Sequence, residues 1–265
     1  MQGSKKREEW GSRVGFILAA AGSAVGLGNI WRFPYTAGKN GGAAFIFIYF
    51  LAVIFIGFPL MCTEVALGRK TRKNPVGAFS AIVPSKFWPL LGMIIVLVAA
   101  FILSYYSVIG GWSLAYMTKS VINGFKPGVD YENLFVGHIS QVWQPIIWHG
   151  IFMILTLVII DSGVIKGIQK WSKILMPSLF FLLLIMAVRS LTLPGSVGGV
   201  EFFLKPDFSQ ISFSTVQAAI SQAFYSLSIG MGPLITYGSY LGKHDSIPDN
   251  IAWVAGMDTL VAIIA

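Results

Sequence analysis

The stretch Ala21-Gly22-Ser23-Ala24-Val25-Gly26-Leu27-Gly28-Asn29-Ile30-Trp31-Arg32-Phe33-Pro34 decides how the rest of this sequence is interpreted. It lies inside an apolar run, yet it carries three glycines within seven positions, an asparagine and an arginine. Each glycine costs about 1 kcal/mol in a helix interior relative to alanine, so the stretch favours a break in the helix. Backbone groups freed inside a bilayer are tolerated only where they are buried in protein or line a cavity. The stretch therefore predicts a broken membrane helix with a binding site at the break.

The alternative is that these glycines are small-residue notches against which a neighbouring helix packs. Helix packing alone does not explain Asn29 or Arg32. In particular, an uncompensated guanidinium several residues inside an apolar segment is costly. We therefore favour the binding site, and we expect another part of the protein to supply the counter-charge of Arg32.

Composition indicates the class of protein. Of the residues, 55% are hydrophobic and 11% are charged, and the apolar residues come in long runs instead of an amphipathic alternation. A bilayer-spanning helix needs about 17–25 residues, and seven runs approach or exceed that length, the last one cut short. The first run is too long for a cleaved signal peptide and holds Arg32, so an all-α integral membrane protein that retains its first span is expected. The runs lie near residues 13–37, 43–67, 88–118, 143–160, 171–193, 213–237 and 250–265.

The net charge of +8 is better explained by membrane topology than by nucleic-acid binding. Most lysines and arginines fall before the first run, between the second and third, and between the fourth and fifth. Because cytoplasmic loops are enriched in Lys and Arg, the N-terminus is predicted to be cytoplasmic. The single cysteine, Cys62, lies in the second run, so no intrachain disulfide is possible and a buried side chain is expected.

A second interruption, Ser226-Leu227-Ser228-Ile229-Gly230-Met231-Gly232-Pro233, lies within the sixth run. Two interrupted spans in corresponding positions are typical of secondary transporters built from inverted repeats, of which the leucine transporter LeuT is one example. We therefore expect a LeuT-type five-plus-five inverted repeat, here with spans 1–6 and part of span 7. Residues 1–193 would form the first repeat with a cytoplasmic tail at 1–9. Residues 194–265 would form an external loop and the start of the second repeat.

Other segments are assigned from their local sequence. The segment 123–142 is expected to be an external loop in which His138 is solvated. A compact cytoplasmic turn is expected at 166–170 and a short interfacial helix at 200–204. Glu64, near the end of the second run, is as compatible with a snorkelling or capping role as with a functional one.

The motifs of the chain form a set that extends over nearly its whole length. They are Arg7-Glu8-Glu9-Trp10, Ala24 through Pro34, Asn40-Gly41-Gly42, Tyr105-Tyr106, Gly167-Ile168-Gln169-Lys170 and Ser226-Leu227-Ser228 through Thr236-Tyr237. This set resembles the neurotransmitter:sodium symporter family. The resemblance implies sodium-coupled symport of hydrophobic L-amino acids across the plasma membrane by alternating access, with Na⁺ as the coupling ion, no cofactor and no enzymatic activity. Met231 between two glycines is similar to the bacterial branch that accepts several hydrophobic amino acids.

The resemblance also implies roles for individual residues at the substrate site. The substrate carboxylate would be held by the amides around Leu27 and Gly28 and by the Tyr106 hydroxyl. The ammonium group would be received by the carbonyls of Ala24, Tyr225 and Ser226, together with Ser228. The side-chain pocket would be lined by Ile102, Tyr225, Ser228 and Met231.

Sodium sites and gates follow from the same resemblance. The first sodium site would use Ala24, Asn29, Ser226 and Asp258, and the second would use Gly22 and Val25. Arg32 would belong to the extracellular gate with Tyr225 as an aromatic lid, and the cytoplasmic gate would use Arg7, Trp10, Ser239 and Tyr240. Na⁺ and substrate would share atoms, so binding of one would favour binding of the other.

The resemblance further implies that transport does not require chloride. In chloride-dependent relatives the anion is held by four residues. Three of them match Tyr49, Gln222 and Ser226 of this chain, and the fourth is a serine that matches position 262. Here position 262 is alanine, which cannot donate a hydrogen bond, and position 258, usually an amide, is a carboxylate. A carboxylate against Na⁺ would replace the charge of chloride, since two adjacent anions repel by roughly several kcal/mol at an effective dielectric of about 20. The alternative is that Asp258 only packs or caps its helix.

The sequence leaves several points open. The family has a second repeat through ten spans, so we expect this chain to be an N-terminal fragment that lacks the acidic partner of Arg32. A non-transporting scaffold derived from a degraded transporter half would look identical over these residues. A membrane-embedded enzyme is disfavoured, because the sequence has no HExxH-like motif, Cys/His cluster or convincing nucleophile–base pair. The preferred amino acid, the Na⁺ stoichiometry and the oligomeric state are not determined.

Overall fold

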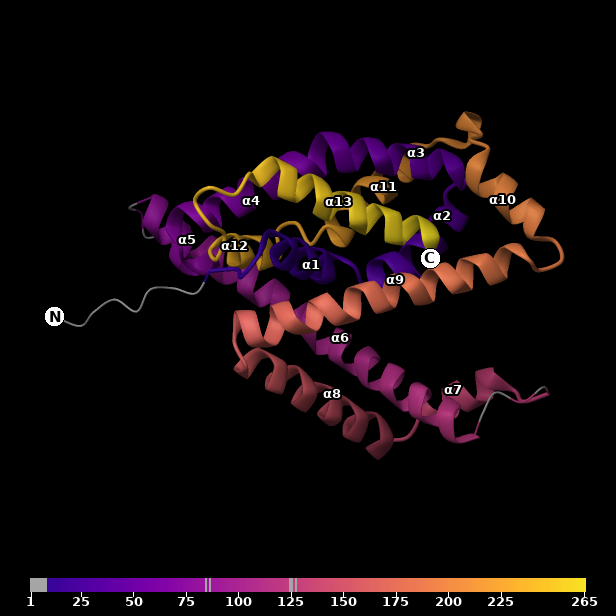
Figure 1. Cartoon of the computed structure of the whole chain (residues 1–265). Helices are drawn as coiled ribbons and strands as arrows, with labels where there is room; N and C mark the ends of the chain where they lie inside the picture. The colour runs from indigo at the N-terminus through magenta and orange to yellow at the C-terminus, as the bar shows by residue number, and fades with distance from the viewer. Residues whose placement is uncertain (1–8, 84, 86, 124–125, 127) are drawn as a thin grey trace. The chain divides into compact units, whose positions relative to one another are not determined.

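The computed structural model of the chain describes residues 9–83, 85, 87–123, 126 and 128–265 (Figure 1). The described residues form helices and connecting segments, with no strand among them. In chain order the elements are α1 (Arg13–Ala24), η1 (Gly28–Arg32), α2 (Phe33–Lys39), α3 (Ala43–Ala52), η2 (Val53–Gly57), α4 (Phe58–Thr71), α5 (Pro75–Ile82), α6 (Trp88–Asn123), α7 (Tyr131–Ile139), α8 (Trp143–Asp161), η3 (Val164–Gln169), α9 (Lys170–Leu191), α10 (Ser196–Leu204), η4 (Phe208–Gln210), α11 (Phe213–Ser226), α12 (Pro233–Gly238) and α13 (Ile247–Ile264). The elements η1, η2 and η3 are π-helical, and η4 is a 3₁₀ turn.

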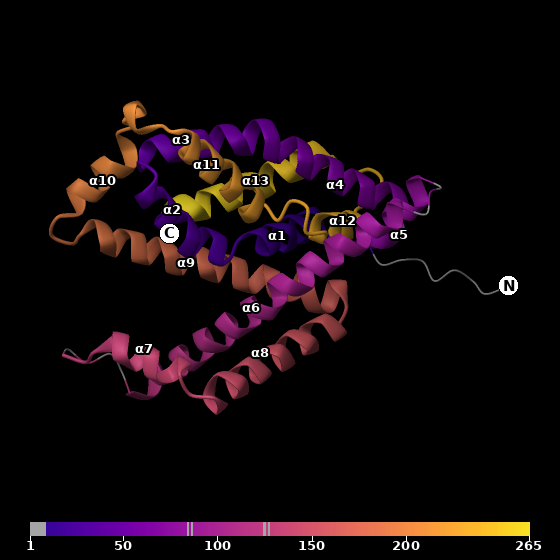
Figure 2. The same ribbon diagram turned by 180° about the vertical axis from the view of Figure 1, so that it is seen from behind.

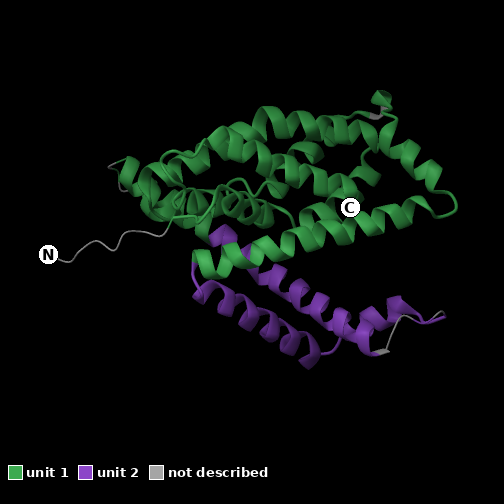
Figure 3. Cartoon of the chain, in the orientation of Figure 1, with its two compact units in different colours: residues 1–96, 164–265 green, residues 97–163 purple. Residues whose placement is uncertain are grey.

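The chain divides into two compact units (Figure 3). Unit 1 comprises residues 1–96 and 164–265, and unit 2 comprises residues 97–163. Within unit 1, α1 packs against α9 and α13, α11 packs against α3, and α12 packs against α4. The view from behind shows α11 beside α3 and α12 beside α4 (Figure 2). These units are defined by contacts within the chain and do not test the repeat boundary expected at residue 193. That boundary stays a prediction.

Five helical segments are long and apolar enough to cross a membrane: Ala43–Thr71, Trp88–Ile122, Trp143–Asp161, Val164–Leu191 and Ile247–Ile264. Two further helical segments, Arg13–Ala24 and Gly28–Lys39, meet at a bend of 51°. If they are counted as one broken helix, they form a sixth span. The predicted span at 213–237 is divided into α11 and α12 by the non-helical segment 227–232. The structure is therefore an all-α membrane fold in which the first and sixth predicted spans are both interrupted.

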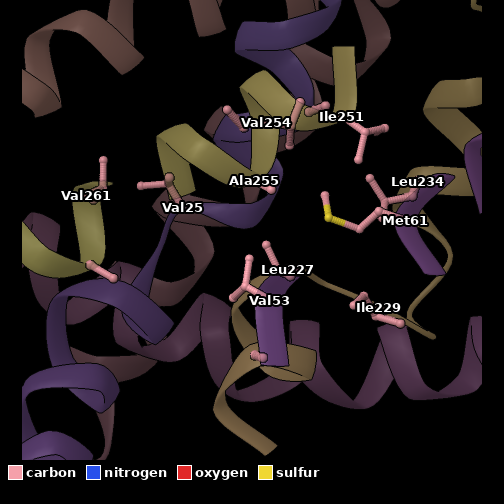
Figure 4. Packing of buried hydrophobic residues seen from close by; sticks show 14 of the residues in the cluster. Val25, Val53, Met61, Leu227, Ile229, Leu234, Ile251, Val254, Ala255 and Val261 are labelled. Carbon is pink, nitrogen blue, oxygen red and sulfur yellow. The ribbon is translucent and has the colours of Figure 1, made fainter. Parts of the chain in front are cut away.

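The core of unit 1 lies between the broken helices and the helices that flank them. Val25 from the first break and Leu227 from the second pack in one cluster with Val53, Met61 and Val254 (Figure 4). Close helix contacts support this core, because a Cβ atom added to Gly238 of α12 would lie 2.5 Å from the Val65 carbonyl oxygen of α4. Small residues at such contacts let two helix backbones approach each other.

The predicted cytoplasmic turn at 166–170 is wrong, because these residues are helical. They lie in the π-helix η3 and at the start of α9, so the fifth span begins at Val164 and not near residue 171. Gly163, just before η3, has a φ of +84°, which lies in the left-handed region that glycine adopts without strain. The residues that follow are then free to continue as helix.

The part of the segment 123–142 from residue 128 onward is not a loop throughout. It contains α7, whose first turn is capped by Asp130, because the Asp130 carboxylate accepts a hydrogen bond from the Asn133 amide at 3.0 Å. The Asn133 backbone and side-chain donors lower the pKa of Asp130 below its ordinary value. His138, expected to be solvated, is buried within unit 2, so that expectation is wrong. The short helix predicted at 200–204 is present as the last part of α10.

Candidate substrate and sodium site

The first interruption of helical geometry follows α1. The helix ends at Ala24, and Val25 has an extended backbone with ψ of 120°. Helical geometry returns in η1 as a π-helical turn beginning at Gly28. The glycine-rich sequence thus breaks the helix where predicted, and at the break the Gly26 amide donates to the Asn29 side-chain oxygen at 3.0 Å.

The second interruption is the segment 227–232, and it contains three residues with left-handed backbones. Gly230 and Gly232 have φ of 77° and 90°, which glycine tolerates. Ser228 has φ of 54°, which is uncommon for a residue with a side chain and typical of functional sites. The segment is therefore held in a conformation that local preference alone would not select.

Three long-range hydrogen bonds join the region of the first break to α11 and to the second break. The Gln222 side-chain amide donates to the Gly28 carbonyl at 2.8 Å. The Ser228 hydroxyl donates to the Ser23 carbonyl at 3.2 Å, and the Asn29 amide donates to the Ser226 hydroxyl at 3.1 Å. The polar groups of the first break therefore face those of the second.

A buried polar cluster lies where these breaks meet α13. Asn29, Ser226 and Asp258 expose at most 1% of their surfaces. The Asn29 Nδ2 group lies 2.8 Å from Asp258 Oδ1 and 2.9 Å from the Asp258 carbonyl. The Ser226 hydroxyl donates to Asp258 Oδ2 at 2.8 Å, and the Tyr49 hydroxyl lies 3.4 Å from the same oxygen. Several oxygens thus converge in one buried place, which is the chemistry that a hard cation requires.

Glu64 contributes to the second break, although the sequence left its role open. Its Oε1 accepts a hydrogen bond from the Gly230 amide at 2.7 Å. Its Oε2 is buried and makes no hydrogen bond among the described residues. An acidic residue inside an apolar run was the signal in the sequence, but only the structure pairs it with the non-helical segment of the sixth span.

Arg32 lies over an aromatic ring of α11. Its guanidinium carbon is 4.7 Å from the centroid of the Tyr225 ring, within the range of a cation–π interaction. The same ring lies against the first break, because a Cβ atom added to Gly28 would come within 3.1 Å of it. The structure therefore brings these two predicted gate residues into contact, whereas their gating role stays a prediction.

The start of the described chain packs on the end of α12. The Trp10 indole donates to the Tyr237 carbonyl at 3.0 Å, and the Trp10 amide donates to the Tyr240 carbonyl at 3.2 Å. The Ser239 carbonyl accepts a hydrogen bond from Arg72 at 3.3 Å. Arg72 also pairs with Glu9 at 3.1 Å, a contact that the sequence analysis missed because the two residues are distant along the chain. Arg7 lies outside the described residues.

The remaining predicted site residues fall into two groups. Those at the breaks of unit 1 are Gly22, Ala24, Val25, Leu27 and Met231. Ile102 and Tyr106 lie on α6 in unit 2, and their assignment to the substrate pocket rests on the resemblance alone.

An all-α membrane fold with two facing, interrupted helices defines the class of secondary transporters. The comparison with protein families agrees, because the model of the sodium:neurotransmitter symporter family matches residues 7–127 and 136–265. The chain belongs to this family, which is one of secondary transporters and not of enzymes.

Individual relatives support the same assignment. The crystal structure of MhsT in complex with L-phenylalanine matches with a TM-score of 0.90 and 46% sequence identity, over 98% of this chain and 59% of that one. The chain is 40% identical to the uncharacterized sodium-dependent transporter YhdH of Bacillus subtilis, over 98% of its own length and 58% of that protein. It is 30% identical to the human sodium-dependent neutral amino acid transporter SLC6A17, over 99% of its own length and 40% of that protein. The chain thus spans about three-fifths or less of these relatives.

Proposed function

We propose that this chain carries the substrate and sodium sites of a symporter that couples Na⁺ to the uptake of hydrophobic L-amino acids. The observation that carries the proposal is the buried cluster of Asn29, Ser226 and Asp258 between the two helix breaks. Membership of a symporter family supports Na⁺ as the coupling ion. The membrane would be the plasma membrane, with the N-terminus on the cytoplasmic side.

In this proposal the first sodium ion binds the Ala24 carbonyl and side-chain oxygens of the buried cluster. The second sodium ion uses backbone oxygens of Gly22 and Val25. Discontinuous helices suit this task, because their exposed carbonyls ligate a cation without adding charge. Ser226 would serve both ion and substrate, so binding of either would favour binding of the other.

The substrate lies between the breaks in this proposal. Its carboxylate faces the amides of Leu27 and Gly28, and its ammonium group faces carbonyls of Ala24, Tyr225 and Ser226. Its side chain contacts Tyr225, Ser228 and Met231. The assignment of Ile102 and Tyr106 to the substrate rests on the family resemblance alone. The flexible Met231 side chain between two glycines favours apolar substrates of different bulk.

The test is uptake of leucine and tryptophan into proteoliposomes that contain the completed transporter, with and without an inward sodium gradient. We expect uptake of both amino acids only with the gradient. Equal uptake in both conditions would contradict sodium coupling, and sodium-dependent binding without uptake would favour the alternative of a non-transporting scaffold.

Asn29→Ala provides a sharper test of the sodium site. It removes hydrogen bonds to Asp258 and Ser226, and a hydrogen bond to a charged group contributes about 1.5–3 kcal/mol. The sodium concentration for half-maximal uptake should therefore rise by about ten-fold or more. Asn40→Ala is the matched control, because the Asn40 side-chain amide donates to the Thr36 carbonyl at 2.8 Å, away from the cluster.

A further inference from the structure

A buried histidine in unit 2 lies apart from the substrate and sodium site. His138 of α7 exposes only 2% of its surface. Its Nδ1 lies 3.2 Å from the Lys119 ammonium of α6 and 3.0 Å from the Gln144 side-chain oxygen of α8. The imidazole also packs edge-on against the Tyr116 ring of α6, with centroids 5.5 Å apart. One ring nitrogen therefore contacts both helices that adjoin α7.

The two polar neighbours of Nδ1 require opposite protonation states. The Lys119 ammonium only donates, so its contact requires an unprotonated Nδ1 that accepts. The Gln144 oxygen only accepts, so its contact requires a proton on Nδ1. The imidazole with its proton on Nε2 therefore satisfies Lys119. The neutral tautomer with its proton on Nδ1 satisfies Gln144 but not Lys119, whereas the imidazolium satisfies Gln144 and also places two cations 3.2 Å apart.

The surroundings of His138 do not compensate a second positive charge. From α6 the titratable groups facing it are Lys119 and Tyr116, and α8 contributes the uncharged Gln144. No ion pair joins His138 to a carboxylate in the part of the chain that the structure describes. Nε2 is buried without a hydrogen-bond partner among the same residues. Protonation of this ring therefore acts directly against the contact with Lys119.

We propose that His138 is a proton-sensitive latch that docks α7 on α6 and α8. The neutral ring accepts from Lys119 and holds the three helices together. Protonation expels the Lys119 ammonium and loosens α7 from its neighbours. Histidine suits this role, because it is the side chain that ordinarily changes charge between pH 5 and 8.

The latch is independent of the proposed transport activity, so its test uses purified protein in detergent, where a single pH acts on the whole molecule. Spin labels are placed at the exposed positions Val136 of α7 and Ile147 of α8, with Cys62→Ser removing the native thiol. Pulsed electron paramagnetic resonance then gives the distance distribution at pH 8 and pH 5. We expect one narrow distance at pH 8 and an about ten-fold loss of that docked population at pH 5.

Three further variants separate the latch from a general effect of acid. Lys119→Gln keeps a donor for Nδ1 and removes the charge, so its distance distribution should be the same at both pH values. His138→Gln should also lose the response, and His244→Asn, an exposed histidine of unit 1, should retain it. The proposal is overturned if the unmutated protein does not respond, or if the response persists in Lys119→Gln. The Lys119→Gln result decides the matter even if His138→Gln does not fold.

Discussion

At the residue scale, Asn29 shows why an amide is needed at the junction of the two breaks. Its Nδ2 group donates to Asp258 and Ser226, while its Oδ1 accepts from the Gly26 amide at 3.0 Å. Only an amide side chain supplies both a donor and an acceptor of this shape. An aspartate at position 29 would instead bring two buried carboxylates together, which is costly unless they are compensated.

Asp258 occupies the equally demanding position opposite Asn29. Its Oδ2 accepts from the Ser226 hydroxyl and lies 3.4 Å from the Tyr49 hydroxyl. By the resemblance, those two hydroxyls match groups that hold chloride in chloride-dependent relatives. The carboxylate thus uses hydrogen-bond donors that an anion would need.

We therefore predict that transport does not depend on chloride. Sodium-driven uptake by the completed transporter should be the same in chloride and in gluconate, because the Asp258 carboxylate would provide the negative charge beside Na⁺ in the proposed site. Asp258→Asn combined with Ala262→Ser removes that charge and restores a hydroxyl, so uptake by the double variant should become chloride-dependent. Asp258→Asn alone is the control for loss of the charge. Strong chloride dependence of the unmutated protein would refute the prediction.

At the element scale, the non-helical segment 227–232 depends on a helix that is remote in sequence. Three of its residues have left-handed backbones, and its Gly230 amide is paired by Glu64 of α4. The Glu64 carboxylate accepts this amide hydrogen at 2.7 Å, so the bond stabilises the interrupted conformation. Glu64 is accordingly a positioning residue for the break.

Substitution of Glu64 should weaken substrate binding. Glu64→Ala removes a charge-assisted hydrogen bond, which contributes about 1.5–3 kcal/mol, so the apparent substrate affinity should fall about ten-fold or more. Glu64→Gln keeps an acceptor for Gly230 and should have a smaller effect. The measurement is the substrate concentration for half-maximal uptake at saturating sodium.

The matched control for this prediction is Glu201→Ala on α10. Glu201 pairs with Lys205 one helical turn away, and both side chains are largely exposed, so removal of the pair should change affinity little. An affinity of Glu64→Ala equal to that of Glu201→Ala would show that Glu64 does not position the break.

At the scale of the whole molecule, the distribution of charge predicts the orientation in the membrane. Basic residues gather near the end of α4 and near the start of α9, at Arg69, Lys70, Lys73, Lys166 and Lys170. Loops rich in Lys and Arg remain on the cytoplasmic side. The segment between α6 and α7 should then face the opposite side.

Thiol labelling tests this orientation. In a Cys62→Ser background, Lys73→Cys should react with a membrane-impermeant maleimide only in inside-out vesicles. Val129→Cys, between α6 and α7, should react only in right-side-out vesicles. The background without an added cysteine controls for nonspecific labelling, and the reversed pattern would contradict a cytoplasmic N-terminus.

The sequence by itself determined the features that depend on residues adjacent along the chain. Long apolar runs predict membrane helices, because a bilayer requires internally satisfied backbones over a fixed length. Clustered glycines predict both interruptions, because their cost in a helix is local. The motifs, through the family resemblance, also named Asn29, Ser226 and Asp258 as one site.

Only the tertiary structure decided which distant groups meet. Asn29 and Asp258 are 229 positions apart, and Glu64 and Gly230 are 166 apart, so no local pattern pairs them. His138 was misjudged for the same reason, since its sequence neighbours resemble a polar loop while its contacts come from α6 and α8. Burial and hydrogen bonding are properties of the packed chain, because they depend on which segments exclude water from one another.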